Sequence, residues 1–235
     1  MKIAVIPARG GSKRIPRKNI KLFCGKPMIA WSIEAAIHSE CFDRIIISTD
    51  DAEIAHVAEA FGGEAPFIRP AELSDDYVGT IPVVAHAIDW MERRGASVEF
   101  ACCLYATAPF VLPQDLRDGF DILVQTNADF ALSVTSYAFP IQRAIRVRAD
   151  QRIEMFQPEF YSSRSQDLEE AFHDAGQFYW GRSTAWLSGL PLFSASAAPV
   201  QLPRFRVQDI DTVEDWTQAE LIFNLLNHYG TKNDI

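Results

Sequence analysis

The sequence concentrates positive charge just after its first apolar segment. Seven basic residues and no acidic residue lie from Arg9 to Lys26. Adjacent glycines, Gly10 and Gly11, stand in the same segment, and they let backbone N–H groups approach a phosphate with no Cβ in the way. The segment leaves the end of an expected strand, which is where open α/β sheets bind ligands. We therefore expect a polyanion such as a triphosphate to bind here, although a solvated basic loop is the alternative.

The glycine spacing excludes two common nucleotide-binding loops. Nothing in residues 7–19 fits the pattern G-x-x-x-x-G-K-[ST] of a Walker A loop. The dinucleotide pattern G-x-G-x-x-G is also absent, which argues against a nicotinamide-dependent oxidoreductase built on a doubly wound sheet.

A pair of carboxylates near the C-terminus could bind a metal ion. Asp209 and Asp211 are two residues apart, so in an extended segment both face the same side. Carboxylate oxygens suit Mg²⁺, which keeps several waters and bridges to substrate phosphates. The alternative is a helix cap, because Thr212 with Asp215 fits a capping box. The two roles are compatible.

A third group of polar residues lies at 164–180. Arg164 could form a bidentate pair with a substrate carboxylate. Gly176 would let backbone approach a ligand, and Phe178, Tyr179 and Trp180 follow it. The alternative is a surface loop followed by an aromatic core strand.

Apolar runs alternate with helix signals along most of the chain. Strands are expected at 2–6, 44–48, 65–68, 100–105, 130–136 and 177–180. Helices are expected at 27–39, between the cap at 49–51 and Gly62, and at 80–94, 113–125 and 213–226. This alternation predicts an α/β fold with a mainly parallel sheet covered by helices on both faces.

The alternation breaks in one stretch. Residues 144–156 alternate apolar and polar side chains around Asp150-Gln151, as in an exposed antiparallel hairpin. We predict a single domain over 1–235, with 138–175 as an inserted segment.

Composition excludes several classes of protein. The net charge is −9, whereas a general nucleic-acid binder is usually basic. No apolar run reaches the ~20 residues needed to cross a bilayer, and the first apolar run is too short for a signal peptide. The four cysteines lack C-x-x-C spacing and are expected to be reduced. We expect a cytoplasmic protein that binds neither nucleic acid nor membrane.

Seven ordered motifs together resemble the CMP-sialic acid synthetase family, the cytidylyltransferases that activate nonulosonic acids. These motifs are Ile6-Pro7-Ala8-Arg9-Gly10-Gly11-Ser12-Lys13 with Lys18-Asn19, Ser48-Thr49-Asp50, Arg69-Pro70-Ala71-Glu72-Leu73, Thr107-Ala108-Pro109, Ser133-Val134-Thr135, Arg164 to Leu168 and Asp209-Ile210-Asp211-Thr212. The resemblance spans nearly the whole chain. It implies a Rossmann-like fold, a homodimer built partly by the inserted segment, and a reaction that uses CTP and Mg²⁺.

The resemblance also implies roles for individual residues. Arg9, Lys13 and Lys18 would be catalytic, through their charge on the triphosphate. The nucleotide would be bound by Ala8, Arg9, Gly10, Gly11, Ser12, Lys13, Lys18 and Asn19, with Arg69 and Thr80 near the cytosine and ribose. The sugar would be bound by Tyr105, Thr107, Arg143, Arg164, Gln166 and Tyr179, and the metal by Asp209 and Asp211.

Two segments resemble the branch of the family that acts on pseudaminic acid. Tyr105-Ala106-Thr107-Ala108-Pro109 stands where sialic acid enzymes usually carry Gln-Pro-Thr-Ser-Pro, and 164–180 is similar to the pseudaminic branch. The expected product is CMP-pseudaminic acid, for glycosylation of surface glycans or flagellin. The alternatives are another nonulosonic acid (neuraminic or legionaminic), a keto-sugar acid, or a nucleotide-binding module without turnover.

Overall fold

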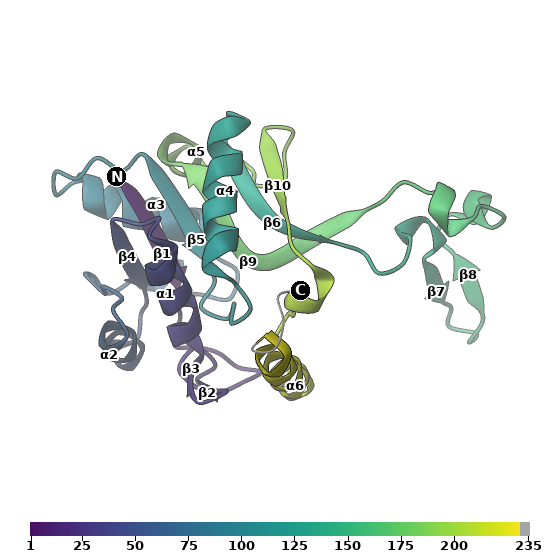
Figure 1. Ribbon diagram of the computed structural model, residues 1–235, viewed down its shortest axis with the longest axis horizontal. Coiled ribbons are helices and arrows are strands. Elements are labelled where there is room, and N and C mark those ends of the chain that lie inside the picture. The colour runs from purple at the N-terminus through teal and green to yellow at the C-terminus, as the bar shows by residue number, and fades with distance from the viewer. Residues whose placement is uncertain (231–235) are drawn as a thin grey trace.

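The computed structural model describes residues 1–230 and is built around a six-stranded sheet. The strand order is β10–β6–β9–β5–β1–β4 (Figure 1). Neighbouring strands are parallel except at β9, which is antiparallel to both β5 and β6. The strands are β1 (Lys2–Pro7), β4 (Arg44–Ser48), β5 (Phe100–Leu104), β6 (Phe130–Ser136), β9 (Phe172–Arg182) and β10 (Ala197–Gln201). The expected mainly parallel α/β sheet is confirmed.

Helices cover both faces of this sheet. One face carries α1 (Met28–Ser39), α2 (Ala52–Ala60) and α4 (Pro113–Gln125), and the other carries α3 (Thr80–Glu92) and α5 (Ser183–Leu187). Along β1, Ala4 and Ile6 belong to the first core, whereas Ile3 and Val5 belong to the second. Successive strand residues point to opposite faces, so a strand buried on both sides must be apolar throughout.

The C-terminal helix α6 (Val213–Gly230) packs beside the sheet on a small aromatic cluster. Phe23 lies in a short hairpin, β2 (Leu22–Phe23) and β3 (Lys26–Pro27). Its ring makes edge-on contacts with Phe110, Trp216 and Phe223 at centroid distances of 6.5, 5.4 and 5.3 Å. Edge-to-face aromatic pairs of this kind stabilise beyond their buried area. The cluster holds α6 against the hairpin.

Residues 138–171, which we call the arm, extend away from the sheet (Figure 1). The arm contains the expected hairpin, β7 (Ile145–Val147) paired with β8 (Ile153–Met155). It leads directly into β9, so the last four residues of the predicted insertion belong to the central sheet. Short 3₁₀ helices complete the chain at Ala71–Leu73, Ile141–Arg143, Pro158–Phe160, Ser165–Asp167 and Arg204–Arg206.

Some sequence-based boundaries were wrong. The strand expected at 65–68 is absent, and only isolated bridges at Glu64 and Ile68 remain. Pro66 lies between them and has no N–H to donate to a ladder. Pro27 is the N-cap of α1 and not its first helical residue. The helix expected to run to residue 94 ends at Glu92. Neither α5 nor β10 was predicted. No helix within residues 1–230 has the length and apolarity to cross a bilayer.

Candidate active site

The site lies where the strands end. The carboxyl ends of β1, β4 and β5 meet at one edge of the sheet, and antiparallel β9 brings its first half to the same edge. Two cavities of about 310 and 600 Å³ adjoin there. They share four lining residues, Lys18, Tyr105, Thr107 and Asp211. Molecules bound in the two cavities would therefore meet at this shared wall.

The first cavity is lined mainly by the basic loop and by the loop before α3. Six of the ten residues predicted to bind the nucleotide line it: Arg9, Ser12, Lys18, Asn19, Arg69 and Thr80. Tyr105 and Thr107, predicted to bind the sugar, and Asp211, predicted to bind the metal, also line it, as does Arg14, to which no role was assigned. Ala8 is buried and hydrogen-bonds through its N–H to Ser48, so it supports the loop from behind.

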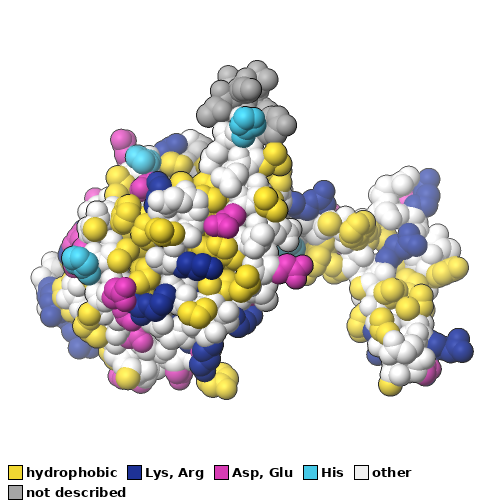
Figure 2. Space-filling view, turned by 90° about the horizontal axis from the view of Figure 1, so that it is seen from below, with side chains coloured by type: hydrophobic (Ala, Val, Ile, Leu, Met, Phe, Trp, Pro, Cys, Tyr) yellow, Lys and Arg dark blue, Asp and Glu magenta, His cyan; other side chains and the backbone are white. Residues whose placement is uncertain are grey.

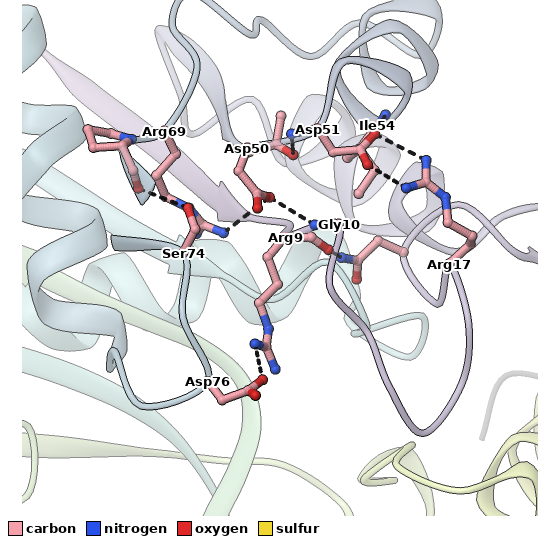
Figure 3. A network of polar contacts seen from close by, with 12 residues as sticks. Arg9, Gly10, Arg17, Asp50, Asp51, Ile54, Arg69, Ser74 and Asp76 are labelled. Atoms are coloured by element: carbon pink, nitrogen blue, oxygen red, sulfur yellow. Dashed lines mark hydrogen bonds and ion pairs between the residues drawn. The ribbon is translucent and has the colours of Figure 1, made fainter. Parts of the chain in front are cut away.

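Position 10 can accept only glycine without a shift of its neighbours. The Gly10 N–H donates to the Asp50 carboxylate at 2.8 Å, and a Cβ at this position would lie 2.6 Å from an Asp51 oxygen (Figure 3). Any larger residue would therefore push the loop away from β4. Gly11, in contrast, has no atom within 4 Å of an added Cβ, so the backbone at this position is open to a ligand.

An acidic residue that sequence reasoning missed pairs with two of the predicted catalytic cations. Asp76, in the loop before α3, accepts a hydrogen bond from Arg9 (Figure 3). It also accepts one from Lys13. The hydrogen bonds from Lys13 and Arg9 hold the pKa of Asp76 below its usual value. A polyanion entering the first cavity would compete with Asp76 for these two cations. No sequence signal marks Asp76, because acidic residues are common in polar loops.

Arg69 is charged and buried at the back of the first cavity. Its side chain is 3% exposed. Its Nε donates to the Ser74 hydroxyl at 3.2 Å, and its Nη2 lies 4.0 Å from the Asp50 carboxylate. Burial lowers the pKa of Arg69, and the Asp50 carboxylate partly offsets this effect. A guanidinium has five N–H donors, and the Nε of Arg69 uses one of them on Ser74. Other N–H groups of this buried guanidinium are suited to hydrogen bonding with a ligand that displaces water.

The second cavity contains both predicted metal-binding carboxylates. Lys18 donates to the Ile210 carbonyl at 2.7 Å and lies 3.3 Å from Asp211, and Arg14 also pairs with Asp211 at 2.7 Å. Partial burial, reinforced by the nearby Asp211, raises the pKa of Asp209. The basic loop and the segment at 209–211 are thus tied together by ion pairs.

Helix capping does not use these two carboxylates. The Thr212 N–H donates to Asp215 at 2.7 Å, and the Asp215 N–H donates to the Thr212 hydroxyl at 3.2 Å. The predicted capping box is confirmed. Asp209 and Asp211 both line the second cavity, and no third His, Cys, Asp or Glu completes a metal-binding group with them within residues 1–230. Two carboxylates fit Mg²⁺, because Mg²⁺ takes its other ligands from water and substrate phosphates.

Tyr179 is not at the cavity surface. It is 1% exposed, its hydroxyl donates to Asp174, and the Tyr105 hydroxyl lies 3.3 Å away. Asp174, which was not predicted, lines the second cavity in front of it. The aromatic signal at 178–180 therefore reflects mostly core packing, since Phe178 and Trp180 are also fully buried.

Three of the six predicted sugar-binding residues lie outside both cavities. Arg143, Arg164 and Gln166 belong to the arm and line neither of the two cavities. Arg164 is exposed and pairs with Asp167 at 2.7 and 3.0 Å. Within one chain, the structure does not bring these residues together with the basic loop or with Asp209.

Comparisons with known proteins agree with this geometry. A family model described as cytidylyltransferase matches residues 3–193. The chain is 44% identical over 226 residues to "Pseudaminic acid cytidylyltransferase" of Campylobacter jejuni subsp. jejuni serotype O:2, covering 96% of this chain and 97% of the relative. It is 30% identical over 230 residues to "CMP-N,N'-diacetyllegionaminic acid synthase" of Legionella pneumophila, covering 95% and 96%.

The fold is also found among solved structures. A structure of CMP:2-keto-3-deoxy-manno-octonic acid synthetase complexed with CTP matches with a TM-score of 0.68 and 18% identity. The match covers 95% of this chain and 98% of that one. At this identity the match supports the fold alone.

Proposed function

This chain belongs to the cytidylyltransferase family, and from that membership we propose that it transfers the cytidylyl group of CTP to pseudaminic acid, releasing pyrophosphate. The observation that carries the proposal is the pair of cavities that share Lys18, Tyr105, Thr107 and Asp211. CTP would occupy the first cavity and the acid sugar the second. Their reacting atoms would then meet at the shared wall.

In the proposed reaction, the anomeric hydroxyl oxygen of the sugar attacks the α-phosphorus of CTP. A new P–O bond forms as the bond to pyrophosphate breaks, and the hydroxyl proton passes to water. Such a transfer depends mainly on positioning and on neutralising phosphate oxygens. Arg9 and Lys13 would neutralise the triphosphate after leaving Asp76, and Lys18 stands at the shared wall. No residue has to act as a covalent nucleophile.

Asp209 and Asp211 would hold Mg²⁺ at the second cavity. When bound, Mg²⁺ withdraws charge from phosphate oxygens and lowers the pKa of a coordinated hydroxyl. Lys18 and Arg14 neutralise Asp211 in its absence. With a metal ion bound to Asp211, this carboxylate would no longer need Lys18 and Arg14 as partners. The two cations would then be available to pair with phosphate oxygens.

We also propose a homodimer in which the arm completes the partner's site. The second cavity is lined by three carboxylates, Asp174, Asp209 and Asp211, and by Lys18 as its only Lys or Arg among the described residues. An acid sugar brings a further carboxylate and needs more positive charge there. The cation predicted for that role, Arg164, is on the arm, outside both cavities of its own chain.

The surface of the arm supports an interface role. Figure 2 shows it as a separate lobe with apolar and basic side chains exposed. Its largely exposed apolar side chains include Phe139, Val147, Ile153, Phe156 and Tyr161. An apolar surface of this kind on an extended segment is typical of a protein interface. A twofold dimer would use both arms equally.

Mixing two inactive variants tests the dimer. Lys18→Ala removes a residue at the shared wall, and Arg164→Ala removes a residue of the arm. If each site uses both chains, hybrid dimers regain one intact site, and an equal mixture recovers about a quarter of the wild-type activity. Activity that stays at the level of the separate variants would contradict the shared site. Sedimentation velocity checks that each variant remains a dimer.

The reaction itself is tested by pyrophosphate release. Each of the four nucleoside triphosphates is combined with pseudaminic, legionaminic and N-acetylneuraminic acids, with and without Mg²⁺. We expect turnover with CTP, dependence on Mg²⁺, and the highest kcat/KM for pseudaminic acid. An apolar lining rejects one extra hydroxyl only ~10²-fold, so weak use of the other sugars is expected. Equal or better use of N-acetylneuraminic acid would contradict the sugar assignment alone.

A cytoplasmic location is part of the proposal. All four cysteines are free thiols, and three of them are buried. Free thiols are typical of a reducing compartment.

A further inference from the structure

A bulge in β9 shapes one wall of the second cavity. Leu132 of β6 pairs with Tyr179, but Val134 pairs with Asp174, so residues 175–178 of β9 stand opposite Ser133 alone. The Ser133 hydroxyl accepts the Phe178 N–H at 3.1 Å and stabilises the distortion. Gly176 within the bulge has a φ of +60°, which favours glycine. Bulges next to active sites commonly re-aim a side chain, and here the residue at its start is Asp174.

Hydrogen bonds fix the orientation of the Asp174 carboxylate. One oxygen accepts the Gly176 N–H at 2.8 Å, and the other accepts the Tyr179 O–H. Because Tyr179 gives its proton to Asp174, the Tyr179 oxygen is left to accept from the Tyr105 hydroxyl at 3.3 Å. Burial raises the pKa of both tyrosines, so both stay protonated at neutral pH. The chain of donors runs from Tyr105 through Tyr179 to Asp174.

This arrangement leaves Asp174 as a pure acceptor that faces the second cavity. Its side chain is exposed there, whereas the two tyrosines behind it are half-buried or buried. A carboxylate has about four lone-pair positions, and two of them are taken by Gly176 and Tyr179. The remaining positions can accept hydrogen bonds from a bound molecule. A like-charged carboxylate placed against Asp174 would be repelled.

We propose that Asp174 is a specificity-determining residue that binds an O–H or N–H donor of the acid sugar and keeps the sugar's carboxylate at the other end of the cavity. The proposal rests on the function proposed above. An acylamino N–H or a ring or side-chain hydroxyl would satisfy Asp174, whereas the carboxylate would turn away from Asp174, toward the positive charge that the arm of the partner is proposed to supply. The sugar would thereby be held in a single orientation, with its anomeric hydroxyl at the shared wall.

Asp174→Asn tests this proposal because it keeps the shape and removes the charge. Hydrogen bonds to a charged group are strong, so we expect kcat/KM for pseudaminic acid to fall about 10- to 100-fold. The Kd for CTP and the melting temperature should stay near the wild-type values. Tyr179→Phe, which removes only the hydroxyl that orients Asp174, should give a smaller loss in the same direction. Asp121→Asn, an exposed carboxylate on α4 outside both cavities, is the matched control.

Substrate analogues identify the donor. One series replaces single hydroxyls of pseudaminic acid by hydrogen, and another replaces single acylamino groups by hydrogen. For the analogue that lacks the bound donor, wild-type enzyme should lose activity, but Asp174→Asn should lose no more. If both proteins lose activity equally with every analogue, Asp174 binds no donor and the proposal is wrong.

The remaining outcomes separate this proposal from the proposed function. If wild-type protein releases no pyrophosphate with any acid sugar, the proposed function itself is wrong. If wild-type protein is active and Asp174→Asn keeps its kcat/KM for the sugar, only the role of Asp174 is wrong. A variant whose CTP affinity and melting temperature fall along with its activity would make Asp174 a structural residue and would also overturn the proposal.

Discussion

Arg206 forms a bidentate ion pair with Asp115, with N–O distances of 2.5 and 2.8 Å, and both side chains are largely buried. The pair joins the turn before Asp209 to the start of α4. Arg206 also donates to the Phe110 carbonyl at 3.2 Å, and its own carbonyl accepts the Gln177 side-chain amide at 2.5 Å. Residues 110–115 and β9 therefore both hold Arg206, which lies three residues before the proposed metal-binding segment.

Replacing Arg206 by Met should destabilise the fold and weaken Mg²⁺ binding. Removing one partner of a buried ion pair leaves an uncompensated charge and costs about 3 kcal/mol. Urea unfolding measures this loss. Adding Asp115→Asn should restore much of the stability, because Asn still accepts from the Leu112 N–H that Asp115 binds at 2.8 Å.

The double variant separates stability from positioning. If Arg206 positions the segment at 209–211, the Mg²⁺ concentration for half-maximal activity stays raised several-fold even where stability has recovered. Calorimetric titration of Mg²⁺ with CTP present gives a second readout. Arg204→Ala is the matched control, because Arg204 lies in the same turn and is exposed. A double variant with normal Mg²⁺ dependence would contradict the positioning role.

Asp209→Asn and Asp211→Asn should lose activity at ordinary Mg²⁺ without a loss of stability. Each change keeps the shape and removes one charge from the proposed metal site. Turnover should recover partly as Mg²⁺ is increased. Asp215→Ala should lose stability but keep its activity, since Asp215 caps α6 through Thr212. Loss of a cap costs about 1 kcal/mol in unfolding experiments and leaves the Mg²⁺ dependence unchanged. An Asp209 variant that melts early but keeps its turnover would instead support a structural role.

Sequence signals predicted the structure correctly where a feature depends only on residues within one segment. The helix α4 begins at Pro113 and ends at Gln125 as expected, because proline suits a first helical turn. The basic loop and the capping box at Thr212 and Asp215 are also readable from adjacent residues. Each of these features depends on neighbours a few positions apart.

Features that depend on distant segments were not readable. Asp76 meets Arg9 and Lys13 across more than 60 positions of sequence, and nothing in either segment indicates the pairing. Asp174 reaches the cavity only because β9 bulges against Ser133. The family resemblance identified Tyr179, but the hydroxyl of Tyr179 binds a carboxylate of its own chain. Tertiary packing decides all three placements.

Asp76→Asn should tighten CTP binding. In the free protein, Asp76 holds Arg9 and Lys13, which the triphosphate must take over. Asn keeps a hydrogen-bond acceptor but removes the charge that competes with phosphate, so the Kd for CTP should fall several-fold. Arg9→Ala should raise the Kd for CTP and lower kcat/KM about 10²-fold, because it removes charge directed at phosphate. Isothermal titration measures both Kd values, with Lys26→Ala as the control outside the two cavities. A higher Kd for Asp76→Asn would contradict competition by Asp76.

The acid stability of the protein should depend on Asp51. This residue caps α2 by accepting from the Glu53 and Ile54 N–H groups at 2.9 and 3.0 Å, and it pairs with Arg17 of the basic loop (Figure 3). The hydrogen bond from Arg17, together with the backbone hydrogen bonds, lowers the pKa of Asp51 from 3.8 to about 2. A carboxyl with a lowered pKa in the folded state binds fewer protons when folded than when unfolded. Its stabilising contribution is therefore complete above pH ~4 and disappears as the pH falls through about 2.

The variant Asp51→Asn isolates this contribution. Asn can still cap α2, but it cannot form the ion pair with Arg17. At pH 6 the variant should be less stable than wild type by about 1–2 kcal/mol, a value reduced from the full shift because the pair is partly exposed to solvent. The difference should shrink steadily between pH 4 and pH 2, because protonation then removes the same charge from the wild-type protein. Urea unfolding of both proteins at several pH values measures it, with Asp121→Asn as a control for loss of an exposed carboxylate. A stability difference that stays constant down to pH 2 would mean that Asp51 acts through its shape as a cap and not through its charge.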